Sequence, residues 1–154
     1  MDIYAYIRKD HRNVAAMMED IPAIRLPVAR QSLFEQIRTE LIAHGRSETE
    51  IFYAAVARAG GDLLSERMKR SAQEHQDIEL LLTVLDVTPV ASDLWMQKFG
   101  ELKQAVTRHV EEESEIFARA RAVLTPAQAR QLVSEMDSVK QACLTEVEFD
   151  IPAL

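Results

Sequence analysis

The sequence predicts an all-α fold, an up-down-up-down antiparallel four-helix bundle with an additional C-terminal helix. Three observations support this class. Apolar residues recur at helical spacing along nearly the whole chain, and no segment shows the sustained alternation of a strand. Four glycines and five prolines in 154 residues leave the chain few places to turn. A length near ~150 residues is typical of one domain with its own core.

The first two helices are expected over residues 2–20 and 28–59. Asp2 is a good N-cap for the first of them. The segment 22–27 begins and ends with proline, so it should form the connection between the two helices. The glycine pair 60–61 is a clear stop signal for the second helix.

The third and fourth helices are expected over residues 62–86 and 92–124, separated by a Val-Thr-Pro interruption at 87–89. Both carry an apolar stripe at helical spacing. Short links between four long amphipathic helices place sequential helices side by side and antiparallel.

A fifth helix is expected to begin at Thr125-Pro126, a cap followed by proline at the first helical position. We therefore divide the chain into a bundle over 1–125 and an appended helix and tail over 126–154, part of the same compact unit. The apolar stripe of the fifth helix must be covered. It either folds back over the bundle or makes a contact with a protein partner or a second copy of the chain.

Charge and composition exclude several classes of protein. A net charge of −7 with scattered Lys and Arg argues against a nucleic-acid partner. No apolar run is long enough to span a membrane, and residues 1–4 do not begin a secretory signal, so we expect a cytoplasmic protein. The single cysteine, Cys143, excludes an internal disulfide, a Cys-based zinc site and an iron–sulfur cluster.

Each of the four bundle helices carries one histidine on its inward stripe, and the fifth helix carries none. The four histidines are His11, His44, His75 and His109. Their separations are 33, 31 and 34 residues. In an antiparallel bundle, such equal spacing returns the chain to nearly the same height after each hairpin. The four imidazoles are therefore expected to meet inside the bundle.

Two carboxylates join these histidines through a short internal match. Residues 44–52 and 109–117 both read H-x3-E-[ST]-E-I-F, which places Glu48 and Glu113 one turn from a histidine on the same face. Glu111 and Glu115 of the same acidic run are expected to lie on a solvated face, and the sequence leaves Glu112 open.

A plain structural scaffold would bury these imidazoles and carboxylates at several kcal/mol each unless they were paired. A metal site removes that cost. Imidazole and carboxylate without thiolate suit iron, manganese or zinc, and six ligands exceed what one zinc needs. Two ions bridged by Glu48 and Glu113 fit better. Glu79, one turn after His75, is either a further ligand or a surface residue, and at least one position stays open for a small molecule.

Other residues have weaker claims on the site. Tyr4, Tyr6 and Tyr53 could form hydrogen bonds near the centre, but we expect them to pack as aromatic core residues. Gly45 costs its helix ~1 kcal/mol relative to alanine, and only close packing beside His44 accounts for it.

The order His11, His44-x3-Glu48, His75, His109-x3-Glu113, with Glu74 directly before His75, resembles the hemerythrin-like HHE cation-binding domain over about residues 1–125. The resemblance implies a non-haem di-iron centre, oxo- or hydroxo-bridged. In it the four histidines are terminal ligands and the two glutamates are bridges. The chain departs from oxygen-carrying hemerythrins at Glu79, where those proteins have a fifth histidine. The added negative charge favours oxidised metals over reversible oxygen carriage.

The resemblance implies a protein that binds or senses oxygen, nitric oxide or redox state, with a diatomic molecule as ligand. Every histidine has a place at the metals, so none is left as a separate catalytic base and we assign no catalytic residue. The alternative is an enzyme of iron handling, which oxidises ferrous iron or donates iron for cluster repair. A third reading is an interaction module whose fifth helix contacts a partner according to the state of the metals.

Overall fold

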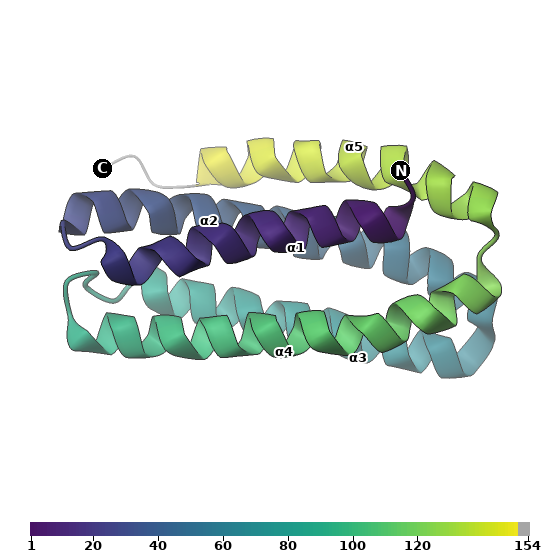
Figure 1. Cartoon of the computed structure of the whole chain (residues 1–154), viewed down its shortest axis with the longest axis horizontal. Helices are drawn as coiled ribbons and strands as arrows, with labels where there is room; N and C mark the ends of the chain where they lie inside the picture. The colour runs from purple at the N-terminus through teal and green to yellow at the C-terminus, as the bar shows by residue number, and fades with distance from the viewer. Residues whose placement is uncertain (151–154) are drawn as a thin grey trace.

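The computed structural model describes residues 1–150, with side chains through Glu146, and this part of the chain is helical throughout except for short connections (Figure 1). Among these residues, no helix combines the length and apolar character needed to cross a membrane. The elements are α1 (Ile3–Asp20), the 3-10 turn η1 (Ile21–Ala23), α2 (Pro27–Ser47), the π-helical segment η2 (Glu48–Tyr53), α3 (Ala54–Asp86), α4 (Asp93–Val123) and α5 (Pro126–Asp150).

Side-chain caps begin three of the helices where the sequence places them. The side-chain oxygens of Asp2, Ser92 and Thr125 each accept the backbone N–H three residues further on, at 3.0, 3.2 and 3.1 Å. Each bond satisfies one of the N–H groups that the first helical turn leaves without a partner. Local sequence chemistry therefore sets the starts of α1, α4 and α5.

The turn between the second and third bundle helices lies inside the segment labelled α3. Gly61 has φ 76° and ψ −164°, a conformation that glycine adopts without the penalty paid by other residues. The second bundle helix thus continues from α2 through η2 as far as Gly60, and the third follows the turn, as the glycine pair predicts.

The first four long helices form the up-down-up-down bundle, which confirms the predicted fold class. Around the bundle, α1 contacts α2 and α4, and α3 contacts α2 and α4. Helix α5 runs along the α1 and α2 side, away from α3 and α4 (Figure 1). Its Leu132 and Met136 are buried in the same cluster as Tyr4 of α1. The apolar stripe of α5 is therefore covered by the bundle itself, as the first of the two expected alternatives requires.

The apolar core is split into two clusters along the bundle. We call the one nearer the Gly61 turn the turn-side cluster. Its members are Ile3, Tyr4, Ile7, Phe52, Tyr53, Val56, Leu64, Met68, Ile116, Phe117, Ala120, Leu124, Ala129, Leu132 and Met136. The loop-side cluster lies toward the opposite end and comprises Val14, Met18, Ile21, Phe34, Ile37, Ile42, Ile78, Leu82, Leu85, Trp95, Phe99 and Leu102.

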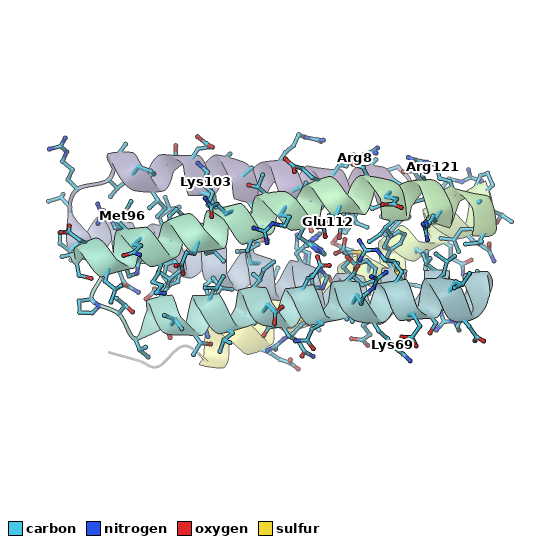
Figure 2. All side chains as sticks on the ribbon, turned by 90° about the horizontal axis from the view of Figure 1, so that it is seen from below. Arg8, Lys69, Met96, Lys103, Glu112 and Arg121 are labelled. Atoms are coloured by element: carbon cyan, nitrogen blue, oxygen red, sulfur yellow. The ribbon has the colours of Figure 1, made fainter. Side chains whose placement is uncertain are left out.

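Cationic side chains cover the aromatic rings of the turn-side cluster. The Arg121 guanidinium lies 4.2 Å from the ring centroid of Tyr4, and that of Arg8 lies 5.1 Å from the ring centroid of Phe117. Figure 2 shows both arginines toward this end of the molecule, one on α1 and one on α4. Each pair joins α1 to α4, so the two helices that carry His11 and His109 are held together there.

Candidate metal centre

The predicted ligands meet in the layer between the two apolar clusters. On α1, His11 lies between Ile7 of the turn-side cluster and Val14 of the loop-side cluster, and the other histidines occupy equivalent levels. The side chains form two groups whose ligand atoms lie within 4.8 Å of one another. Cluster A comprises Glu48, His75, His109 and Glu113, and cluster B comprises His11, His44 and Glu48.

Glu48 belongs to both clusters and divides its oxygens between them. Oε1 lies 3.0 Å from Nε2 of His75 in cluster A, and Oε2 lies 3.5 Å from Nε2 of His44 in cluster B. The side chain is fully buried. A carboxylate with one oxygen in each group is suited to bridge two cations.

Glu113 is arranged in the same way on the opposite helix. Its Oε1 lies 3.0 Å from Nε2 of His109, and its Oε2 lies 3.2 Å from Nε2 of His11. The imidazole of His11 therefore reaches the same layer as the other three. Two buried carboxylates thus connect the two clusters.

The donor atoms fit metal ions. His44 Nε2, both oxygens of Glu48 and Oε2 of Glu113 are buried without a hydrogen-bond partner among the described residues. The Nε2 atoms of His75 and His109 approach to 2.9 Å. With metal–ligand bonds of ~2.1 Å, ligands at right angles lie ~3.0 Å apart, close to the spacings found here. Convergent lone pairs at this spacing are stabilised by a cation.

The outward ring nitrogens of three histidines have partners of their own: Nδ1 of His44 lies 2.9 Å from Asp10 Oδ2, Nδ1 of His109 lies 2.7 Å from Glu74 Oε2, and Nδ1 of His75 lies 2.8 Å from Thr49 Oγ1. An ionised carboxylate only accepts hydrogen bonds, so the first two Nδ1 atoms donate. Their Nε2 atoms then present lone pairs to the clusters, an arrangement typical of metal-binding histidines.

In the absence of a metal, protons take the place of the cations. Burial alone would lower the pKa of His44, but the charge of Glu48 and the hydrogen bond to Asp10 raise it to about 10. Burial would also lower the pKa of His109, but the hydrogen bonds and charges of Glu113 and Glu48 raise it to about 11. Burial would raise the pKa of Glu48, yet contact with the histidines holds it well below the usual range. The layer therefore strongly favours positive charge between its carboxylates.

The π-helical segment η2 brings a further residue into the layer. In an α-helix, residues five apart lie on different faces, whereas the i→i+5 hydrogen bonds of a π turn place them on a similar face. Tyr53 follows Glu48 by five residues and is 1% exposed. In the matching segment of α4, which has no such turn, the equivalent Ala118 is exposed.

The hydroxyl of Tyr53 donates to Glu113 Oε1 at 2.5 Å and lies 3.2 Å from Nε2 of His109. Its ring also stacks on His75, with centroids 5.2 Å apart. Burial and the charges of the nearby carboxylates raise the pKa of the hydroxyl well above its usual range, so it stays protonated. The ring of Tyr53 packs as expected, and its hydroxyl adopts the alternative role of a hydrogen bond at the centre.

Two outer carboxylates, Asp10 and Glu74, share a pattern in the sequence. Asp10 directly precedes His11, and Glu74 directly precedes His75. Each acid bonds a histidine of another helix, His44 or His109, rather than its neighbour in sequence. An acid immediately before an inward histidine is therefore the pattern by which these residues are recognisable.

Gly45 makes room for His75. A Cβ added at Gly45 would lie 3.4 Å from Cγ and 3.6 Å from Nδ1 of His75. The close packing that the sequence suggests beside His44 is thus found against the imidazole of the neighbouring helix, and a side chain larger than alanine would press on it.

Glu79 lies apart from both clusters. Its carboxylate bonds the Arg46 guanidinium at 2.9 and 3.4 Å, and its side chain is partly exposed. It does, however, line the cavity described next. Its assignment as a ligand stays a prediction, and the geometry favours the alternative of an ion pair between α2 and α3.

A cavity of about 40 Å³ borders the layer on its loop-side face. Its polar lining residues are the histidines of all four bundle helices together with Asp10 and Glu79, and apolar side chains of the same four helices complete the wall: Val14, Leu41, Ile78, Val106 and Val110. The cavity thus joins the ligand cluster to an apolar surface.

Comparison with known proteins agrees with this geometry. The sequence model of the family "Hemerythrin HHE cation binding domain" matches residues 2–120. The chain belongs to this family. The match includes all six residues of clusters A and B and ends before α5 begins.

Two similar proteins place this HHE domain in context. A crystal structure of an HHE cation binding domain-containing protein from Mycobacterium kansasii has a TM-score of 0.83 at 20% identity, over 98% of this chain and 92% of that one, and shows the same fold. A protein of Nostoc sp. named DNA nickase is 28% identical over 141 residues, which are 91% of this chain. The chain spans only 39% of the length of that relative.

Proposed function

We propose that this HHE domain is a non-haem di-iron protein that binds or senses a small diatomic molecule, oxygen or nitric oxide, or the redox state of its surroundings. One observation carries the proposal: Glu48 and Glu113 each direct one oxygen to cluster A and one to cluster B, beside a cavity of about 40 Å³. The arrangement supports two ions bridged by two carboxylates.

The residues divide between the two ions by cluster. His75 and His109 would bind the first and His11 and His44 the second, with the two glutamates shared between them. Iron supplies one-electron redox chemistry and an affinity for diatomic ligands when bound. Asp10 and Glu74 orient two of the imidazoles through Nδ1, and the Tyr53 hydroxyl donates a hydrogen bond to Glu113 Oε1 across an oxygen–oxygen distance of 2.5 Å.

The cavity supports a small neutral ligand. A water molecule needs ~10–15 Å³ of such volume, so about 40 Å³ has room for a molecule of two or three heavy atoms. Five aliphatic side chains line the cavity, and a small neutral molecule packs against them without the loss of hydration that an ion would pay there. Oxygen and nitric oxide satisfy both conditions.

The proposal is tested by loading the protein with ferrous iron without oxygen, and then exposing it to oxygen or, separately, to nitric oxide. We expect about two irons per chain and a new absorption spectrum with each gas. Clearly fewer irons than two, or spectra unaffected by both gases, would refute it. Manganese and zinc loading in parallel tests whether the clusters select iron, since all three metals suit these donors.

A second candidate is an enzyme of iron handling, and the position of Tyr53 favours it. A hydroxyl that contacts both a bridging carboxylate and His109 is placed to move a proton during repeated turnover. Oxidation of many equivalents of added ferrous iron per chain, or transfer of iron to an apo-acceptor, would favour this function over sensing. We do not extend the nickase activity to this chain, because a net charge of −7 opposes binding to DNA phosphates.

A further inference from the structure

Lys140 of α5 is a buried cation close to the centre, although it lies outside the residues that the family matches. Its residue is 9% exposed, and Nζ lies 2.7 Å from Asp10 Oδ1 and 3.5 Å from Glu40 Oε2. Lysine is rarely buried to this extent without a paired anion. Its main partner here is Asp10.

The two oxygens of Asp10 connect Lys140 to cluster B. Oδ1 accepts from the ammonium, and Oδ2 accepts from Nδ1 of His44 at 2.9 Å. The opposite nitrogen of that ring, Nε2, faces Glu48 Oε2 at 3.5 Å. An unbroken series of polar contacts therefore runs from α5 to a donor atom of the centre.

Cluster A has a similar series of a histidine, a carboxylate and a cation, and all three residues belong to bundle helices. Nδ1 of His109 bonds Glu74, whose other oxygen lies 3.5 Å from Arg67. Arg67 also lies 3.9 Å from Glu112, which Figure 2 shows on α4 near the middle of the bundle. Each cluster thus has one histidine held by a carboxylate that is balanced by a cation. In cluster B that cation comes from α5.

We infer that Lys140 is a positioning residue of the metal centre, which balances Asp10 and so sets the orientation and donor strength of His44. The inference rests on the proposed function, since it assigns His44 to a metal. An anion without its cation attracts the Nδ1 proton more strongly, which makes the imidazole a stronger donor toward the metal. A stronger donor favours the more oxidised metal, so loss of Lys140 lowers the reduction potential.

The test compares variants of the iron-loaded full chain. Lys140→Met removes the charge and the hydrogen bond, Lys140→Gln removes the charge alone, and Lys140→Arg restores the charge. Tyr6→Phe is the matched control, because the Tyr6 hydroxyl makes another α1–α5 hydrogen bond, to Asp137 at 2.8 Å, without touching the ligands. Iron content, absorption spectrum and midpoint potential are measured for each protein.

We expect Lys140→Met and Lys140→Gln to retain iron and to shift the potential downward with a changed spectrum. Lys140→Arg should return both readouts toward the wild type, and Tyr6→Phe should leave them unchanged. If Lys140→Met does not fold, Lys140→Gln decides the question. Unshifted potentials in the charge-removing variants, or an equal shift in Tyr6→Phe, overturn the inference. A wild-type chain that binds no metal overturns the proposed function itself, which separates the two failures.

Discussion

Among single residues, Glu113 gives the clearest evidence that part of the acidic run of α4 belongs to the metal site and not to a solvated face. It is fully buried between His109 and His11, whereas Glu115, two residues further on, is 68% exposed at its side chain and pairs with Arg119. The two glutamates belong to one acidic run in the sequence. Their environments differ because α4 turns one toward the bundle axis and the other toward solvent.

Replacing Glu113 by Gln should remove metal. The amide nitrogen cannot bind a cation and the bridge loses its charge, so iron content should fall from about two to at most one per chain. Glu115→Gln is the control and should keep the wild-type iron content. Metal analysis after anaerobic loading measures both, and an unchanged iron content in Glu113→Gln would contradict the bridging role.

Glu79 gives a second test at this scale. If its ion pair with Arg46 is its role, Glu79→Gln should retain iron and change stability by no more than about 1 kcal/mol, as is usual for partly exposed pairs. If Glu79 is instead a ligand, the variant should lose iron while Arg46→Gln keeps it. Iron content of the two variants distinguishes the roles.

At the scale of elements, η2 explains what helical periodicity missed. Regular α-helical spacing places His44 and Glu48 on the inward face of their helix, and the same spacing indicates the other four residues of clusters A and B. This spacing does not indicate Tyr53, because the π turn shifts its face relative to an unbroken α-helix. Nothing in its local sequence distinguishes it from a packing tyrosine.

Tyr53→Phe tests whether the hydroxyl supports the carboxylate or binds metal itself. Phenylalanine keeps the ring that stacks on His75, but Glu113 Oε1 loses its donor. We expect iron content to be unchanged and the metal-free protein to lose about 1–3 kcal/mol of stability, measured by denaturant unfolding. Loss of iron in this variant would show instead that the hydroxyl is a ligand.

Helix α5 was predicted as an element, but its partner was not. An apolar stripe indicates that a helix is covered without identifying the surface that covers it. The contacts of Lys140 with Asp10 and of Tyr6 with Asp137 join residues about 130 positions apart, and no short-range pattern reveals them.

The packing of α5 predicts a stability effect. Met136 is fully buried in the turn-side cluster, so Met136→Ala should cost about 2–5 kcal/mol. The adjacent Glu135 is exposed, and Glu135→Ala should stay within about 0.5 kcal/mol of the wild type. Denaturant unfolding of both variants measures the difference, and equal stabilities would contradict the docking of α5 on the bundle.

For the whole molecule, the charge of the central layer predicts opposite pH responses with and without metal. The folded pKa values of His44 and His109 are raised from 6.5 to about 10 and about 11. The stability that these two histidines give the metal-free protein is fully present below pH 6.5 and is lost as pH rises through the folded pKa values. Because the pKa of Glu48 is lowered, the stability that its carboxylate contributes is present above its ordinary pKa of 4.5 and is lost in acid.

Metal ions compete with protons for the same imidazoles, so metal binding strengthens as pH rises over this range. We therefore expect the difference in Tm between metal-loaded and metal-free protein to widen from pH about 6 to pH about 9. Thermal unfolding of both forms across this range measures it. A difference that is constant or narrows with pH would contradict the exchange of protons for metal.

The division of the core into two apolar clusters also bears on how the molecule folds. Each cluster is a partial core at one end of the bundle, and the layer between them is polar on all four helices. Without a metal, only protonated histidines paired with the carboxylates connect the two ends through this layer, so we expect the ends to open more independently of each other. Metal bound by ligands from all four helices couples the ends, and thereby makes unfolding a single cooperative transition.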